Sequence, residues 1–330
     1  MPKIELHLHL EGAFTFEFLF ELIQKYGGDE TVESVDDIKS KFVFKDFPHF
    51  IETWFWKNQF FKSAVDFERS TYFTLKKLHE QNVIYAEVFY SPWDFVQFGL
   101  QVEAITEATL SGIDRAKKDF GIHGNLIADL CRDYGAEQAT ARFKQIIPYK
   151  NKGLIGIGLG GSEQNFPPRP FEEVFKLAKQ NGFHRVAHAG EAAGPESIWA
   201  ALQFLNIERI GHGVRAIEDP KLVEHINEKQ IPLEICPTSN VKTGIFPNIA
   251  AHPVKHFFED GLFVTINSDD PAMFGTTITD EFLLLHDKLD FNPTSFKQLT
   301  KNALEASFLS QPEKMKYVIQ IDSYWGEFKQ

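Results

Sequence analysis

The sequence predicts a (β/α)8 TIM barrel with additional helices, formed by a single domain over residues 1–330. Two observations lead to this fold class. Short apolar or β-branched runs alternate with helix-like stretches along most of the chain, which is typical of βα units and a parallel sheet. Eight such runs occur in the 330 residues, and eight βα units in about 250 residues or more fit a closed barrel.

The predicted strands are the short apolar or β-branched runs, taken in chain order. They span 4–10, 84–90, 124–130, 154–159, 185–188, 209–211, 232–236 and 262–267. Helix-like segments lie between them, as the alternating pattern of a barrel requires. These segments lie near 103–119, 135–150, 171–181, 195–205, 219–228 and 250–259, and a helical tail over 278–330 is expected to wrap the barrel.

The chain between the first two strands holds more helical pattern than one βα unit needs. Thr15 is a suitable N-cap for a helix from about 15 to 26, and the polar segment 27–37 leads to a second helical pattern. Residues 46–64 are crowded with aromatic side chains, which predict either a helix packed on the core or a lid over an apolar pocket. Residues 65–81 have the spacing of a long amphipathic helix.

Composition narrows the possible partners and the location. The formal net charge of −12 argues against nonspecific binding to nucleic acid or to anionic membranes. Only two cysteines occur, so no disulfide framework is expected. Charged residues interrupt the N-terminus and no run of about 18 apolar residues appears, so we expect no signal peptide, no transmembrane helix and a cytoplasmic protein. The sequence predicts no particular oligomeric state.

The first strand ends in the motif HLHLEG, at residues 7–12. His7 and His9 are two residues apart, so on a strand both imidazoles point to the same face. An isolated pair of this kind is often a chance occurrence on a half-exposed strand. Three further motifs favour a site instead, because each follows a predicted strand: HAGE (188–191), IGHG (210–213) and NSDDP (267–271). In such barrels the chemistry gathers at the carboxyl ends of the strands.

These motifs supply the donor set of a zinc site. Three neutral imidazoles and one carboxylate suit Zn²⁺ with an open position for water, and zinc lowers the pKa of bound water toward about 7. We therefore predict one zinc ion per chain. Its expected ligands are His7, His9, His188 and Asp269. The other histidines, apart from His212, do not share this pattern and are expected to be surface or core residues: His49, His79, His123, His184, His225, His252, His256 and His286.

Polar residues of the same motifs remain free for proton transfer and substrate contacts. Glu191 follows His188 through an Ala-Gly turn, and we interpret it as a proton shuttle rather than a solvated surface charge. His212 could orient or deprotonate the attacking water. Asp270 is predicted to contact the substrate, and the glycines at 160 and 161 leave room for a ligand to approach the backbone.

The ordered set HLHLEGA, HAGE, RIGHG, CPTSN and NSDDP resembles the adenosine deaminase family of the amidohydrolase superfamily, over roughly residues 2 to 310. The resemblance implies a mononuclear zinc barrel that hydrolytically deaminates small aminopurines. It implies that Glu191 protonates the purine N1 and that His212 assists the attacking water. By position, Asp270 would contact N7, the Gly161 backbone would contact N3, and Glu11 would accept a hydrogen bond from the ribose 5′-hydroxyl.

The resemblance leaves the substrate open. It implies deamination of adenosine or 2′-deoxyadenosine to the 6-oxo product and ammonia, with adenine and aminofutalosine as alternative substrates for the same mechanism. Glu11 and the stretch SEQNFPP lean toward adenine deaminases, whereas RIGHGVR and PTSNVKTG lean toward bacterial adenosine deaminases. Gly158 stands where the common pattern has aspartate.

Two other classes remain as alternatives. A binuclear amidohydrolase usually needs a bridging Lys or Glu at the end of the fourth strand, which here ends in Gly-Leu-Gly-Gly. A catalytically inactive barrel kept for binding is disfavoured because every catalytic position is filled.

Overall fold

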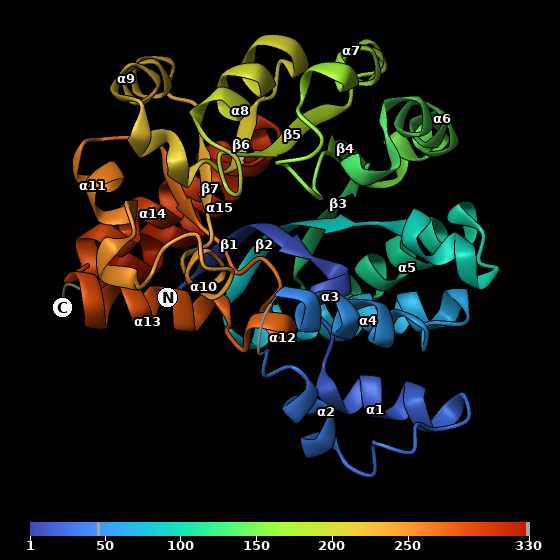
Figure 1. Ribbon diagram of the computed structural model, residues 1–330. Coiled ribbons are helices and arrows are strands. Elements are labelled where there is room, and N and C mark those ends of the chain that lie inside the picture. Colours follow the sequence, from blue (N-terminus) through green and yellow to red (C-terminus); the bar gives the residue numbers. More distant parts are fainter. Residues whose placement is uncertain (45–46, 328–330) are drawn as a thin grey trace.

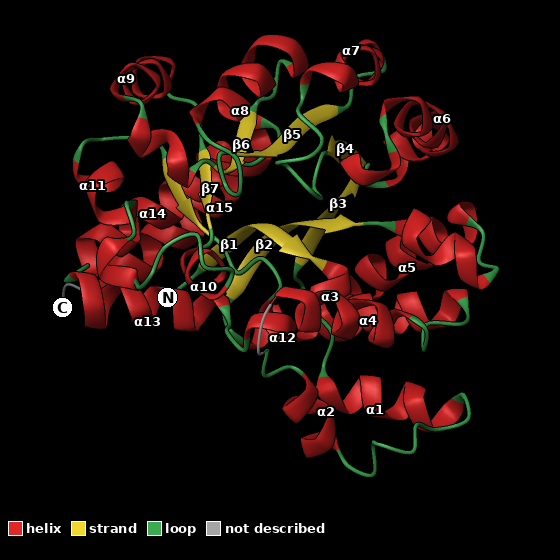
Figure 2. Ribbon diagram, in the orientation of Figure 1, coloured by secondary structure: helices red, strands yellow, loops and turns green. Residues whose placement is uncertain are grey.

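The computed structural model describes residues 1–44 and 47–327 and consists of a parallel barrel surrounded by helices (Figures 1 and 2). Eight strands are hydrogen-bonded in sequence order, which confirms the predicted fold class. All the predicted strands form, with small shifts at their ends. They are β1 (Lys3–His9), β2 (Val83–Tyr90), β3 (His123–Asp129), β4 (Leu154–Gly158), β5 (His184–Ala189), β6 (Arg209–His212), β7 (Leu233–Ile235) and β8 (Val264–Ile266).

The barrel closes between its first strand and the segment that follows its last. Leu8 pairs with Asp269 in an isolated parallel bridge. The backbone N–H of Asp269 donates to the carbonyl of His7, and the N–H of His9 donates to the carbonyl of Asp269, both at 2.9 Å. This closure sets Asp269 directly beside the two histidines of the first motif, although more than 250 residues separate them in the chain.

Helices on the outside of the barrel follow the predicted βα alternation (Figure 2). They are α5 (Val102–Phe120), α6 (Ala136–Ile146), α7 (Glu172–Gln180), α8 (Pro195–Ala200), α9 (Pro220–Lys229) and α11 (Val254–Glu259). Two short helices at the rim were not predicted: α10 (Pro237–Lys242) and α12 (Pro271–Phe274). Both begin with proline, whose fixed φ suits the first helical position and is the sequence signal that could have located them.

Four helices separate β1 from β2. Thr15 caps α1 (Phe16–Lys25) as predicted, since its side chain accepts a hydrogen bond from the Phe18 N–H at 3.2 Å. The second helical pattern predicted after the polar segment 27–37 forms α2 (Val35–Lys41), which begins inside that segment, behind a capping box made by Ser34 and Asp37. The aromatic segment forms α3 (Phe47–Asn58), and α4 (Ala64–Glu80) follows. Residue 46, the first of the predicted segment, lies outside the described residues.

The C-terminal part folds into α13 (Ile278–Leu289), α14 (Pro293–Ala306) and α15 (Gln311–Glu327). As predicted, this region lies against the barrel, because α14 contacts both β1 and β8 and so covers the point where the barrel closes (Figure 1). The last three residues of the predicted tail, 328–330, lie outside the described residues. Over the described ranges, no helix combines the length and the apolar character that crossing a bilayer demands.

Candidate active site

Four side chains predicted to bind metal meet at the carboxyl ends of the strands. His188 Nε2 lies 3.1 Å from His7 Nε2 and 3.2 Å from His9 Nε2. Asp269 Oδ1 lies 3.6 Å from His7 Nε2 and 3.5 Å from His9 Nε2. All four residues are buried. Burial lowers the pKa of His7 and of His188 well below the usual range, so both imidazoles are neutral and offer lone pairs. Three imidazole nitrogens and one carboxylate oxygen fit a catalytic zinc ion.

A second set of ligand-type atoms shares two of these residues. His7, His212, Cys236 and Asp269 also bring one ligand atom each within 4.8 Å of the others. Burial raises the pKa of the Cys236 thiol well above its usual range, which disfavours the thiolate that a metal needs. The set made by His7, His9, His188 and Asp269 requires no such ionisation of a buried thiol, so it is the better metal site.

Backbone geometry explains how the rim residues reach the site. His212 and Asp269 have φ values of 58° and 61°, a left-handed conformation that non-glycine residues seldom adopt. Such residues cluster at functional sites, where the surrounding structure holds them in place. For Asp269 the holding contacts are the two backbone hydrogen bonds to β1 that close the barrel.

A buried network of charged side chains orients the ring of His7. Glu234 Oε2 lies 2.7 Å from His7 Nδ1, which leaves Nε2 free to face the other ligands. Arg209 bridges Glu234 and Glu87, with ion-pair distances of 2.5 Å to each. Glu234 was not predicted. It lies in β7, where a lone glutamate in an apolar run was the available signal.

Packing explains why residue 158 is glycine, where the common pattern of the family has aspartate. A Cβ there would lie 2.8 Å from the ring of Phe89. That ring stacks on His9, with centroids 5.1 Å apart, and packs against His7 at 4.9 Å. Gly158 therefore makes room for the aromatic side chain that supports both histidines.

Glu191 and His212 lie beside the metal-type cluster. Glu191 Oε2 is 3.6 Å from His212 Nε2, which is also 3.8 Å from Asp269 Oδ2. Burial raises the pKa of Glu191 to about 7, so near neutral pH this carboxyl can both hold and release a proton. Burial lowers the pKa of His212, but the charges of Glu191 and Asp269 outweigh it and raise that pKa overall.

The loop that carries Glu191 is held by a second, unpredicted glutamate. Glu163 Oε1 accepts a hydrogen bond from the Gly190 N–H at 2.6 Å. Its Oε2 accepts from the N–H groups of residues 191, 192 and 193, at 3.1, 2.8 and 2.9 Å. Glu163 belongs to the SEQNFPP stretch, so the sequence singled out the segment but not the role.

His252, which the sequence placed among unrelated surface or core histidines, is connected to the site. It is buried, and its Nε2 lies 3.1 Å from Asn240 Oδ1. Asn240 in turn lies 3.1 Å from His212 Nδ1, measured from its Nδ2. Asn240 is the last residue of the CPTSN motif, which carried the resemblance but received no role.

Asp270 lies at the predicted substrate side. A Cβ on Gly12 would come within 1.9 Å of Asp270 Oδ1, so the glycine of HLHLEG makes space for this carboxyl. Among the described residues, Oδ1 is buried without a hydrogen-bond partner. Burial, reinforced by the charge of Asp269, raises the pKa of Asp270 well above its usual range.

Glu11 lies near an unpredicted buried lysine. Glu11 Oε1 accepts from the Ser91 N–H at 2.7 Å, and its buried Oε2 has no hydrogen-bond partner in the described part of the chain. Burial raises the pKa of Glu11 to about 7 and lowers that of Lys57 to about 8, while each charge partly offsets the shift of the other. Lys57 is fully buried in α3 and lies 3.8 Å from the centroid of the Trp54 ring.

Gly161 has a φ of 92°, and a Cβ there would lie 2.1 Å from Asp133 Oδ2. Only glycine fits this position, where the resemblance implies a backbone contact to the substrate.

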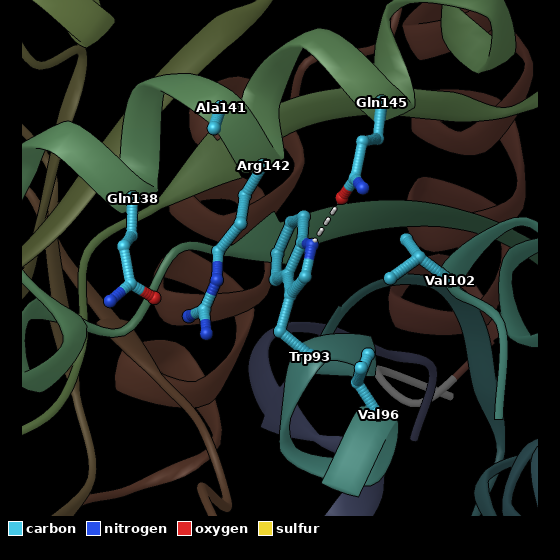
Figure 3. Close-up of a pocket in the computed structure, with 7 residues that line it drawn as sticks. All are labelled: Trp93, Val96, Val102, Gln138, Ala141, Arg142 and Gln145. Atoms are coloured by element: carbon cyan, nitrogen blue, oxygen red, sulfur yellow. Dashed lines mark hydrogen bonds between the residues drawn. The ribbon is translucent and has the colours of Figure 1, made fainter. Parts of the chain in front are cut away.

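A separate cavity of about 210 Å³ lies outside the barrel between the η2 segment (Pro92–Phe98) and α6 (Figure 3). Trp93 Nε1 donates to Gln145 Oε1 at 2.9 Å across it. None of the predicted site residues lines this cavity.

Comparison with known proteins agrees with this geometry. A sequence profile described as adenosine deaminase matches residues 2–324. The chain belongs to the adenosine deaminase family. This confirms the resemblance seen in the motifs and extends it beyond residue 310.

Two relatives of this family member are named adenine deaminases. The protein from Hahella chejuensis is 35% identical, over 98% of this chain and 97% of its own length. The solved structure from Arthrobacter aurescens has a TM-score of 0.94 at 31% identity and covers 98% of this chain and 99% of that chain. An amidohydrolase from Burkhoderia ambifaria, solved with bound zinc, shares the fold with a TM-score of 0.91 at 24% identity, over 99% of this chain and 91% of that one.

As a member of the adenosine deaminase family, the chain is a hydrolase that acts on carbon–nitrogen bonds of cyclic amidines. The names of the relatives favour adenine, the alternative substrate, over adenosine or 2′-deoxyadenosine, the substrates expected first. The expectation of a nucleoside substrate is not confirmed, since the relatives are named for free adenine.

Proposed function

We propose that this protein hydrolyses adenine to its 6-oxo product and ammonia, with one zinc ion per chain. The observation that carries the proposal is the meeting of four ligand-type side chains with Glu191 and Asp270 at one rim. The names of the relatives support adenine as the substrate.

His7, His9, His188 and Asp269 would hold the zinc ion. When bound, zinc supplies Lewis acidity that lets water act as a nucleophile near neutral pH. Glu234 supports this site because its contact with His7 Nδ1 fixes the orientation of that ring.

Glu191 is placed to move the proton that activates the purine. Its pKa of about 7 means that a large share of molecules carry the protonated carboxyl at neutral pH. Protonation of N1 draws electron density from C6, which then accepts the oxygen of water more readily. The site need only stabilise the tetrahedral carbon better than the flat purine to lower the barrier.

Asp270 is proposed to hold the imidazole half of the purine through N7. N7 is an acceptor, so its partner must donate a hydrogen bond. The raised pKa of Asp270 favours the protonated carboxyl, which can donate. The buried oxygen without a protein partner is available for this contact.

Replacing Asp270 tests this contact. Asp270→Ala is expected to lower kcat/KM by about 10- to 100-fold, the cost of one buried polar contact. Zinc content should be unchanged, as measured by elemental analysis, because Asp270 is not among the proposed ligands. Asp270→Asn keeps an N–H donor and should lose less activity than Asp270→Ala. Loss of zinc in either variant would show that the two aspartates have exchanged roles.

Glu11 is proposed to accept a hydrogen bond from the N9 edge of the purine. Its unpartnered oxygen suits a donor, and free adenine offers one at N9, whereas a nucleoside offers the ribose 5′-hydroxyl instead. Burial of both Glu11 and Lys57 beside α3 supports the smaller ligand, because a sugar at that end would have to displace packed side chains.

A substrate panel separates the free base from the nucleosides. Ammonia release would be measured with adenine, adenosine, 2′-deoxyadenosine and aminofutalosine. We expect kcat/KM for adenine to exceed that for each nucleoside by at least about 100-fold, because a nucleoside lacks the N9–H and its sugar would have to displace the packed side chains beside Glu11 and Lys57. A preference for adenosine over adenine would contradict the proposed substrate while leaving the reaction class intact.

A further inference from the structure

His212 is joined through its second ring nitrogen to a buried hydrogen-bond chain that ends on the backbone. The Val254 N–H donates to His252 Nδ1 at 3.1 Å. His252 Nε2 and Asn240 Oδ1 are 3.1 Å apart, as are Asn240 Nδ2 and His212 Nδ1. The three side chains are at most 4% exposed, so water does not compete for these contacts.

The Val254 N–H, at the backbone end, determines which atom donates in each hydrogen bond of this series. A backbone N–H can only donate, so His252 Nδ1 must be the acceptor. Burial lowers the pKa of His252 to about 3, and a neutral imidazole carries its one proton on the other nitrogen. His252 Nε2 therefore donates to the Asn240 oxygen. The Asn240 amide nitrogen is then left to donate to His212 Nδ1.

We propose that Asn240 and His252 are positioning residues that hold His212 with Nδ1 as a hydrogen-bond acceptor and a proton on Nε2. The proton then points toward the space between Glu191 and Asp269, the two carboxylates within 3.8 Å of that nitrogen. His212 thus acts as a hydrogen-bond donor to the oxygen that attacks C6. It does not act as the base that removes a proton from it, because its only lone pair faces Asn240.

The opposite direction is ruled out by proton counting. If His212 Nδ1 donated to Asn240 Oδ1, the Asn240 amide would donate to His252 Nε2. His252 would then accept at both nitrogens, which a neutral imidazole cannot do. A second proton on His212 would enter at Nδ1 and point at the amide N–H of Asn240.

The tautomer can be measured directly. In ¹⁵N-labelled protein, long-range ¹H–¹⁵N correlation spectra distinguish protonated from unprotonated ring nitrogens, and His212→Gln assigns the signals. At pH 7.5, with and without added zinc, we expect His212 to show a protonated Nε2 and an unprotonated Nδ1. A protonated Nδ1 in the wild-type protein, alone or together with Nε2, would overturn the proposal whatever the variants do.

Asn240→Asp should invert the tautomer with little change in shape. The new carboxylate can accept from His252 Nε2 and from His212 Nδ1, so the proton of His212 should move to Nδ1. We expect unchanged zinc content and a fall in kcat of at least about 100-fold, since a wrong histidine tautomer has cost about 10⁴ in serine proteases. Asn206→Asp adds the same charge at an exposed position and should behave as wild type.

The kinetic part of this test rests on the proposed function, whereas the spectra do not. An Asn240→Asp variant that keeps both the Nε2–H tautomer and full turnover would refute the proposed positioning of His212 by Asn240 and His252. If the wild-type protein shows the expected tautomer but deaminates no aminopurine, the proposed function is wrong and the proposed positioning of His212 remains supported.

Discussion

Glu191→Gln is expected to lower kcat by about 10²–10⁴, the usual contribution of a general acid or base, while the fold and zinc content stay unchanged. The amide has nearly the same shape as the carboxyl but cannot deliver a proton to N1. The loop should remain in place, because Glu163 holds it through backbone N–H groups rather than through the Glu191 side chain. Steady-state ammonia release and elemental analysis measure the two quantities.

The pH dependence gives this variant a second readout. The pKa of Glu191 is raised to about 7, so the proton it delivers is present below that pH and is lost as pH rises through it. For wild type, kcat/KM should therefore fall on the alkaline side of about pH 7, and Glu191→Gln should lack this limb. Glu224→Gln, an exposed change on α9, is the matched control. A Glu191→Gln enzyme within a few-fold of wild type would contradict the assigned role.

His9→Ala is expected to remove the metal and the activity together. Loss of one of four ligands leaves an incomplete site, and zinc content should fall from about one ion per chain toward zero. The lost Lewis acidity is worth several kcal/mol of barrier, which corresponds to about 10³ or more in kcat. Elemental analysis of protein expressed with ample zinc measures the first effect, and ammonia release measures the second.

Two further variants help to interpret the result for His9→Ala, one as a control and one with a smaller expected effect. His256→Ala removes an exposed imidazole on α11 and should change neither quantity. Glu234→Gln should weaken zinc binding by about 10- to 100-fold without abolishing it, because this residue orients His7 and does not bind the metal itself. A His9→Ala protein that kept full zinc occupancy would show that another ligand set, such as the one including Cys236, holds the metal.

The rim residues could be located from the sequence because strand periodicity and barrel topology act together. His7 and His9 share a face by alternation along one strand, and that step needs no tertiary information. His188, His212 and Asp269 follow predicted strands, and parallel strands in a barrel end at the same rim. The eight strands themselves were found because each buried run is short and apolar.

The supporting residues were not located because they act through contacts distant in the chain. Glu234 reaches His7 across 227 positions, and Glu163 reaches Gly190 across 27. His252 carries no local signal that separates it from an ordinary core histidine. The start of α2 was misplaced for a different reason: its polar first turn matched a loop, although Ser34 and Asp37 form a capping box there.

By itself, the sequence determined the barrel, the rim and the types of donor atom that meet there, because these depend on periodicity and on the order of strands. Only the tertiary structure decided which protonation states and orientations those atoms have. Burial raises the pKa of Glu191 to about 7, closure of the barrel places Asp269 between the first two histidines, and the Val254 N–H directs the chain that ends on His212. Desolvation and hydrogen-bond direction are properties of the packed neighbours, which linear spacing does not encode.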